Sequence, residues 1–153
     1  MVSVTNAIAQ AQCDLVVDAI DVGGAGKLVF YKTSEAFTDP ATVNNSLQGD
    51  NTVLAELAFE STAFTDALMD GSNAVATLTG GTAITDTAAD ASGDAGFARA
   101  ISGGGAVVAQ FSVIGSVGGG TADIVVTSST AAATFTQNLP VEIATFSYSQ
   151  PTV

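Results

Sequence analysis

The chain has 153 residues, of which 3 are Lys or Arg and 15 are Asp or Glu, so its formal net charge is −12. Charged residues form 12% of the chain, about half the share of an ordinary domain, while 47% of the residues are hydrophobic. Three cations cannot neutralise a row of phosphates, and a chain with no His and one Cys cannot form a His/Cys metal site. We therefore expect one compact acidic domain that is not an enzyme, holds no cofactor or metal, and binds neither nucleic acid nor membrane.

The first 24 residues predict an amphipathic helix over residues 5–21. Thr5 or Asn6 can cap its start, and Gly23-Gly24 can end it. On a helical wheel, one polar stripe spans about 80° and contains Gln10, Asp14, Asp18 and Asp21. The other side is apolar and contains Ile8, Ala11, Leu15, Val16 and Ala19. We expect the acidic stripe to face solvent, with a cationic partner as the alternative.

Residues 25–153 predict a second segment that consists of about eight short strands separated by Gly-rich turns. The expected strands are residues 27–33, 52–60, 74–79, 82–87, 97–102, 106–114, 122–127 and 141–149. Residues 34–51 are polar and predict a long loop, which in a small domain is often a contact element. The fold class expected is mainly β: an antiparallel β-sandwich or jelly-roll-like barrel preceded by one N-terminal amphipathic helix.

Few residues suggest chemistry. Asp86, Asp90 and Asp94 offer oxygens for Ca²⁺, but their spacing of four differs from known calcium loops, so we expect a solvated loop. The glycines at 80–81, 103–105 and 118–120 predict hairpin turns, and the pair Glu56/Glu60 lacks the aromatic residues of a glycosidase site. Cys13 is expected to be buried. Arg99 is expected to form a structural ion pair, with an interchain pair as the alternative.

A series of short motifs runs along the whole chain. These motifs are Asn6, Gly23-Gly24-Ala25-Gly26, Lys27-Leu28 with Tyr31, Leu54-Ala55-Glu56-Leu57, Ala63-Phe64, Asp70-Gly71, Gly96-Phe97 with Arg99, Val117-Gly118, Asp123-Ile124-Val125-Val126 and Ser149-Gln150-Pro151. Their order resembles that in a group of small virion proteins of tailed bacteriophages that are encoded beside the major capsid protein. The loop at Thr38-Asp39-Pro40 is longer than that group leads us to expect.

The resemblance implies a capsid decoration or cement protein, made in the host cytoplasm and located on the capsid exterior of the virion. The implied partner is the major capsid protein, and we expect a homo-oligomer, with a trimer as the first expectation. The contact residues that we predict are Ile8, Leu15 and Ala19 on the helix, and Phe37 and Leu47 in the long loop. The alternative function is a receptor- or glycan-binding β-module associated with a tail or fibre.

Overall fold

The computed structural model describes residues 4–117, 122–126, 132–143 and 145–151. These residues form one α-helix, two short 3-10 turns and eleven strands. The elements are α1 (Asn6–Asp18), η1 (Ala19–Asp21), β1 (Lys27–Lys32), β2 (Val53–Ala58), β3 (Leu68–Asp70), β4 (Asn73–Thr77), η2 (Thr79–Gly81), β5 (Ile84–Asp86), β6 (Gly93–Ile101), β7 (Val107–Gly115), β8 (Ile124–Val126), β9 (Ala133–Phe135), β10 (Val141–Ile143) and β11 (Ser147–Pro151). The prediction of a mainly β fold preceded by one helix is confirmed.

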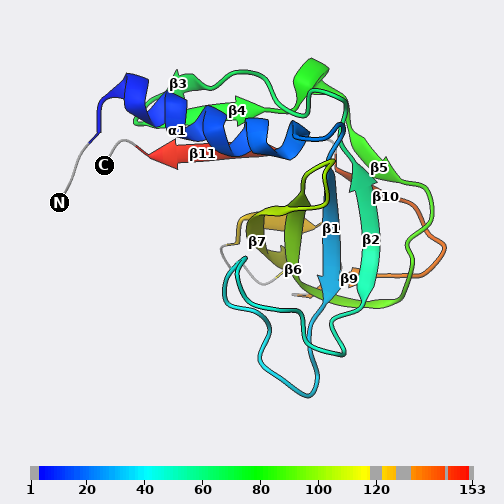
Figure 1. Cartoon of the computed structure of the whole chain (residues 1–153). Helices are drawn as coiled ribbons and strands as arrows, with labels where there is room; N and C mark the ends of the chain where they lie inside the picture. Colours follow the sequence, from blue (N-terminus) through cyan, green and yellow to red (C-terminus); the bar gives the residue numbers. More distant parts are fainter. Residues whose placement is uncertain (1–3, 118–121, 127–131, 144, 152–153) are drawn as a thin grey trace.

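The main sheet has the strand order β2-β1-β6-β7-β8, with β9 paired to the first part of β6. Its strands pair in the antiparallel sense except β7 and β8, which are parallel. The sheet curls into half a barrel, and β5 pairs with β10 beside it. A second sheet, β11-β4-β3, lies at one end of the main sheet (Figure 1).

The two faces of the main sheet follow from the alternation of side chains along β1. Leu28 and Phe30 point into the main hydrophobic core, while Val29 and Tyr31 point to the opposite face. On that opposite face, the rings of Tyr31 and Phe97 stack with their centroids 5.2 Å apart. The outer face of this sheet is therefore also apolar at its centre, and it needs a cover.

Helix α1 lies across β4 and β11 and buries one narrow face (Figure 1). Ala9, Cys13 and Val17 form the buried face, and Ile20 of η1 continues it. The Cys13 thiol donates to the carbonyl oxygen of Tyr148 on β11 at 3.6 Å. Cys13 is thus buried as expected, and the spacing of four residues marks the face that packs on the sheet. The helix shares one core with the strands. The predicted boundary between a helical segment, residues 1–24, and a β domain, residues 25–153, stays a prediction.

A chain of aromatic rings connects the layers of the core. Phe59 contacts Phe64, Phe64 contacts Phe146, and Phe146 meets Phe111 edge-on at 5.3 Å between centroids. These rings come from the end of β2, the segment before β3, the segment before β11, and β7. The core is therefore continuous from the helix-bearing sheet to the main sheet.

The end of the helix is fixed by a close approach between two glycine-rich turns. The amide of Gly103 donates to the carbonyl oxygen of Ile20 at 3.2 Å, and the amide of Gly104 donates to that of Val22 at 2.8 Å. A Cβ at Gly103 would lie 2.5 Å from the carbonyl carbon of Gly24 and closer still to its oxygen. Gly23 has a φ of +86°, which glycine adopts without strain. The β6–β7 turn therefore docks on the exit from η1.

Several sequence expectations need correction. Residues 93–96 are the first part of β6 rather than a loop, and β3 and β9 are short strands within segments that had no strand prediction. The predicted strand 141–149 is two strands, β10 and β11, which pair with different neighbours. Gly103–Gly105 do form the β6–β7 hairpin turn, but Gly80 and Gly81 belong to η2, which joins β4 to β5. The glycines at 118–120 lie outside the described residues.

Candidate interaction surfaces

The helix exposes a second apolar face to solvent. Ile8 and Leu15 on α1 and Val22 just after η1 are 48%, 73% and 64% exposed. The spacing of seven residues places Ile8 and Leu15 on one side of α1, about opposite to the buried face, and Val22 is exposed just beyond η1. Ala11 is also exposed on this side. We call Ile8, Ala11, Leu15 and Val22 the outer stripe. Ala19, which we expected among the contacts, is half-buried at its edge.

The acidic side of the helix is not the solvated face expected from the sequence. The Asp14 carboxylate accepts from the Ala67 amide at 2.6 Å, and the Asp21 carboxylate accepts from the Ala63 amide at 3.0 Å. Gln10 donates to the carbonyl oxygen of Ala67 at 3.0 Å. These side chains bind the segment between β2 and β3, and the two carboxylates are the acceptors for the amides of Ala63 and Ala67. Of the three aspartates on this acidic side of the helix, only Asp18 is exposed, and Asp14 and Asp21 are half-buried.

The long loop between β1 and β2 is held by its own acidic residues at its base. Asp39 accepts from the amide of Ser34 at 2.7 Å and from the side-chain amide of Asn51 at 2.8 Å. Asp50 accepts from the Ser34 hydroxyl at 2.7 Å and from the amide of Glu35 at 2.8 Å. The hydrogen bond from Ser34, followed by those from backbone amides, holds the pKa of Asp50 below its ordinary value.

Arg99 and Gln110 fix the middle of this loop to the outer face of the sheet. Arg99 is only 5% exposed, and its guanidinium donates to the carbonyl oxygen of Asn45 at 2.8 Å. Its Nε donates to Oε1 of Gln110 at 2.9 Å, and Gln110 donates to the carbonyl oxygen of Pro40 at 2.7 Å. The guanidinium carbon also lies 5.5 Å from the centre of the Phe97 ring.

The prediction that Arg99 forms a structural ion pair is therefore wrong for the described residues. Its acceptors are neutral oxygens of Gln110, Thr42 and Asn45, and the ion pairs among the described residues are Lys27–Glu56 and Lys32–Glu35. A loop offers neutral carbonyl groups along its backbone, and a buried guanidinium can satisfy several of them at once. An interchain pair of Arg99 stays a prediction.

The loop exposes two of the predicted contact residues. Phe37 is 60% exposed and Leu47 is 40% exposed. They do not lie beside the outer stripe: α1 precedes the start of β1, and the loop follows its end, so the two surfaces lie at opposite ends of the molecule (Figure 1). The structure thus separates the five predicted contact residues into two surfaces.

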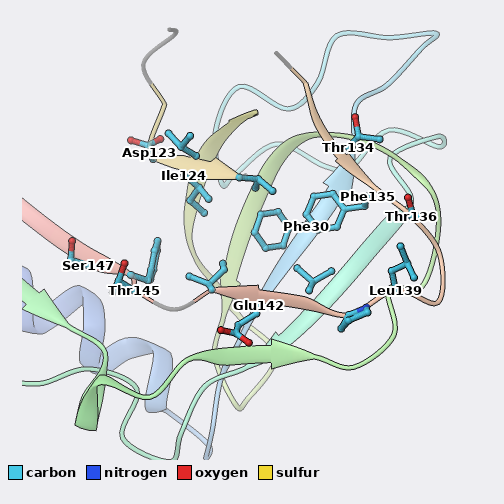
Figure 2. Close-up of a pocket in the computed structure, with 16 residues that line it drawn as sticks. Phe30, Asp123, Ile124, Thr134, Phe135, Thr136, Leu139, Glu142, Thr145 and Ser147 are labelled. Atoms are coloured by element: carbon cyan, nitrogen blue, oxygen red, sulfur yellow. The ribbon is translucent and has the colours of Figure 1, made fainter. Parts of the chain in front are cut away.

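A cavity of about 650 Å³ lies in the opening of the curled sheet, between β8, β9 and β10 (Figure 2). Phe30 and Phe135, whose rings are 5.1 Å apart, form its floor, and Thr134, Asp123 and Glu142 lie around it. One carboxylate oxygen of Asp123 already accepts two hydrogen bonds within the chain, from the amide and from the hydroxyl of Ser112, both at 2.8 Å. Sequence reasoning missed this cavity, because it is assembled from four short segments that carry no motif.

The candidate calcium residues do not converge. Asp86 accepts from the amides of Glu56 and Ala88 at 3.0 Å each, and Asp94 accepts from the hydroxyl of Thr134 at 2.7 Å. Among the described residues, no three potential ligands of the His, Cys, Asp or Glu type lie close enough to hold a metal ion. Within the same part of the chain, no helix has the length and apolar character needed to cross a membrane.

Comparisons with known proteins give no relative: no family model, no curated protein and no solved structure matches this chain.

Proposed function

We propose that this protein is a non-enzymatic structural component of a tailed-bacteriophage virion, which binds the capsid lattice through the outer stripe. The observation that carries the proposal is the double-faced helix. Ala9, Cys13 and Val17 already pack on the chain's own sheet, yet the opposite face of α1 presents Ile8 and Leu15, and Val22 is exposed just beyond η1. A helix that is apolar on both faces is typical of one covered on both sides.

The resemblance to virion proteins suggests which protein covers the outer stripe. In this proposal the partner is the major capsid protein, the location is the capsid exterior, and the chain acts as a homo-oligomer such as a trimer. Covering Leu15 completely would stabilise the complex by about 1.5–3 kcal/mol, or roughly a 10- to 100-fold change in affinity. Repetition over a shell multiplies such a contact through avidity.

The test uses particles of the phage that encodes the chain. Mass spectrometry of purified particles establishes presence and copy number, and particles that lack the protein are then mixed with the purified chain. Leu15→Asp should abolish binding, whereas the matched variant Leu139→Asp should bind normally. Leu139 is 55% exposed in the β9–β10 turn, far from α1 (Figure 1). Normal decoration by Leu15→Asp would refute the assignment of the stripe.

The alternative, a receptor- or glycan-binding module, has one observation in its favour. Phe37 is an exposed aromatic side chain on a loop that is fixed at its base and middle, and sugars stack on such rings. Under this alternative, Phe37→Ala would remove binding to host cells, and Leu15→Asp would not.

A further inference from the structure

We infer that the surface that covers the outer stripe is a protein face with an apolar centre bordered by lysine and arginine side chains. This inference rests on the proposed function, in which the stripe is a docking surface, and it specifies the chemistry of the partner. It follows from where the chain's few cations lie and from the charges that surround the stripe.

All three cations of the chain are already engaged elsewhere. Lys27 pairs with Glu56 at 2.6 Å across the β1–β2 ladder, and Lys32 pairs with Glu35 at 2.5 Å at the base of the loop. Arg99 is buried beneath the loop at the other end of the molecule. None of these three side chains lies on α1, so the helix itself places no lysine or arginine beside the outer stripe.

Acidic side chains lie along one side of the stripe. Asp18 on α1 is exposed, and on the helical wheel it falls next to Ala11 of the outer stripe. The segment between β2 and β3, which α1 holds through Asp14 and Asp21, contributes the exposed residues Glu60 and Asp66. The docking surface is therefore an apolar row with a negative border on the side of Asp18.

This charge pattern excludes two other occupants on physical grounds. A second copy docked stripe to stripe would bring together two chains that each carry a net charge of −12, and like charges at an interface are unfavourable. Helices that lie on membranes carry lysine or arginine beside their apolar face, whereas this helix carries aspartate. A homo-oligomer of this chain would have to use another surface.

The test uses two stapled helical peptides as probes for the intact chain. Both have one leucine face; in the first it is bordered by lysines, and in the second by glutamates. Fluorescence anisotropy measures their binding to the wild-type chain and to variants whose folding is verified by circular dichroism. We expect the lysine peptide to bind and the glutamate peptide not to bind. Leu15→Ser should weaken binding of the lysine peptide about tenfold.

Two double variants with the same change in charge separate local from global electrostatics. Asp18→Asn with Asp66→Asn removes one exposed charge on α1 and one on the segment that α1 holds, and Asp90→Asn with Glu142→Gln removes two exposed charges that lie on neither of these segments. The first should weaken binding of the lysine peptide by about threefold at low salt, and the second should leave it unchanged. The difference should vanish at about 0.5 M salt, because screening removes interactions between exposed charges.

Each other outcome overturns the inference. Equal binding of both peptides would show that charge has no role, and binding that survives Leu15→Ser would show attraction to net charge alone. Failure of both peptides to bind, or a concentration-dependent dimer that Leu15→Ser dissociates in sedimentation experiments, would do the same. The particle experiment tests the proposed function separately. If phage particles do not bind the chain, the proposed function is refuted, even when the two peptides bind as expected.

Discussion

The docking of the β6–β7 turn on the helix exit allows a sharp test of how α1 is held. Gly103 does not have a positive φ, so Gly103→Ala changes only the space that the residue occupies. Its new Cβ would meet backbone atoms of Gly24, which cannot rotate away as a side chain can. Overpacking costs about 1–3 kcal/mol, and the two turn hydrogen bonds contribute about 1 kcal/mol each if they break. We therefore expect a loss of at least about 3 kcal/mol.

Urea and thermal unfolding followed by circular dichroism measure this loss. For a chain of this size, about 3 kcal/mol corresponds to a Tm lower by roughly 6–12 °C. The matched control is Gly49→Ala, because a Cβ at Gly49 would meet nothing within 4 Å. It should change the stability by less than about 0.5 kcal/mol, or stabilise the chain slightly. Equal midpoints for the two variants would refute the close approach of the turns.

Two further predictions concern the loop. Arg99→Met removes the donors to Asn45 and Gln110, so the backbone amides of residues 40–51 should exchange with solvent faster, while those of β1 stay protected. Hydrogen exchange resolved by residue measures these rates. The control is Lys27→Met, which removes a cation that pairs with Glu56 instead of the loop. Because the folded pKa of Asp50 lies below the ordinary 3.8, its carboxylate stabilises the fold above pH 3.8, and that contribution disappears as the pH falls through the lower folded value. The stability difference between wild type and Asp50→Asn should therefore vanish in acid, and a difference that persists there would contradict the role of the charge.

The strands that sequence reasoning located are those with a strong internal pattern. In β1, alternation of Leu28 and Phe30 with Val29 and Tyr31 is visible without the fold. By contrast, β3 and β9 have three residues each, too few for a period to show. Residues 93–96 have the composition of a turn, yet they are extended because β9 pairs with them. There, pairing within the sheet overrides local preference.

The helix shows why a surface is harder to predict than an element. Its existence, its Thr5 cap and its end before Gly23 follow from local chemistry. Its orientation does not, because Ala9, Cys13 and Val17 are as apolar as the outer stripe, and either face fits a core. The polar side chains were equally ambiguous, since Asp14 serves a backbone amide that comes from more than fifty residues away. The structure exposes the predicted contact residues Ile8 and Leu15, and the partner that covers them stays a prediction.

The chain has no Trp and only two Tyr, so its ultraviolet fluorescence comes from two places. Tyr31 lies on the outer face of the main sheet where the long loop begins, and Tyr148 lies on β11 behind the helix. Replacing either one by Phe leaves a single intrinsic reporter at a known pole of the molecule. A binding partner thus discloses, without any attached dye, which pole it covers by the emission that it alters.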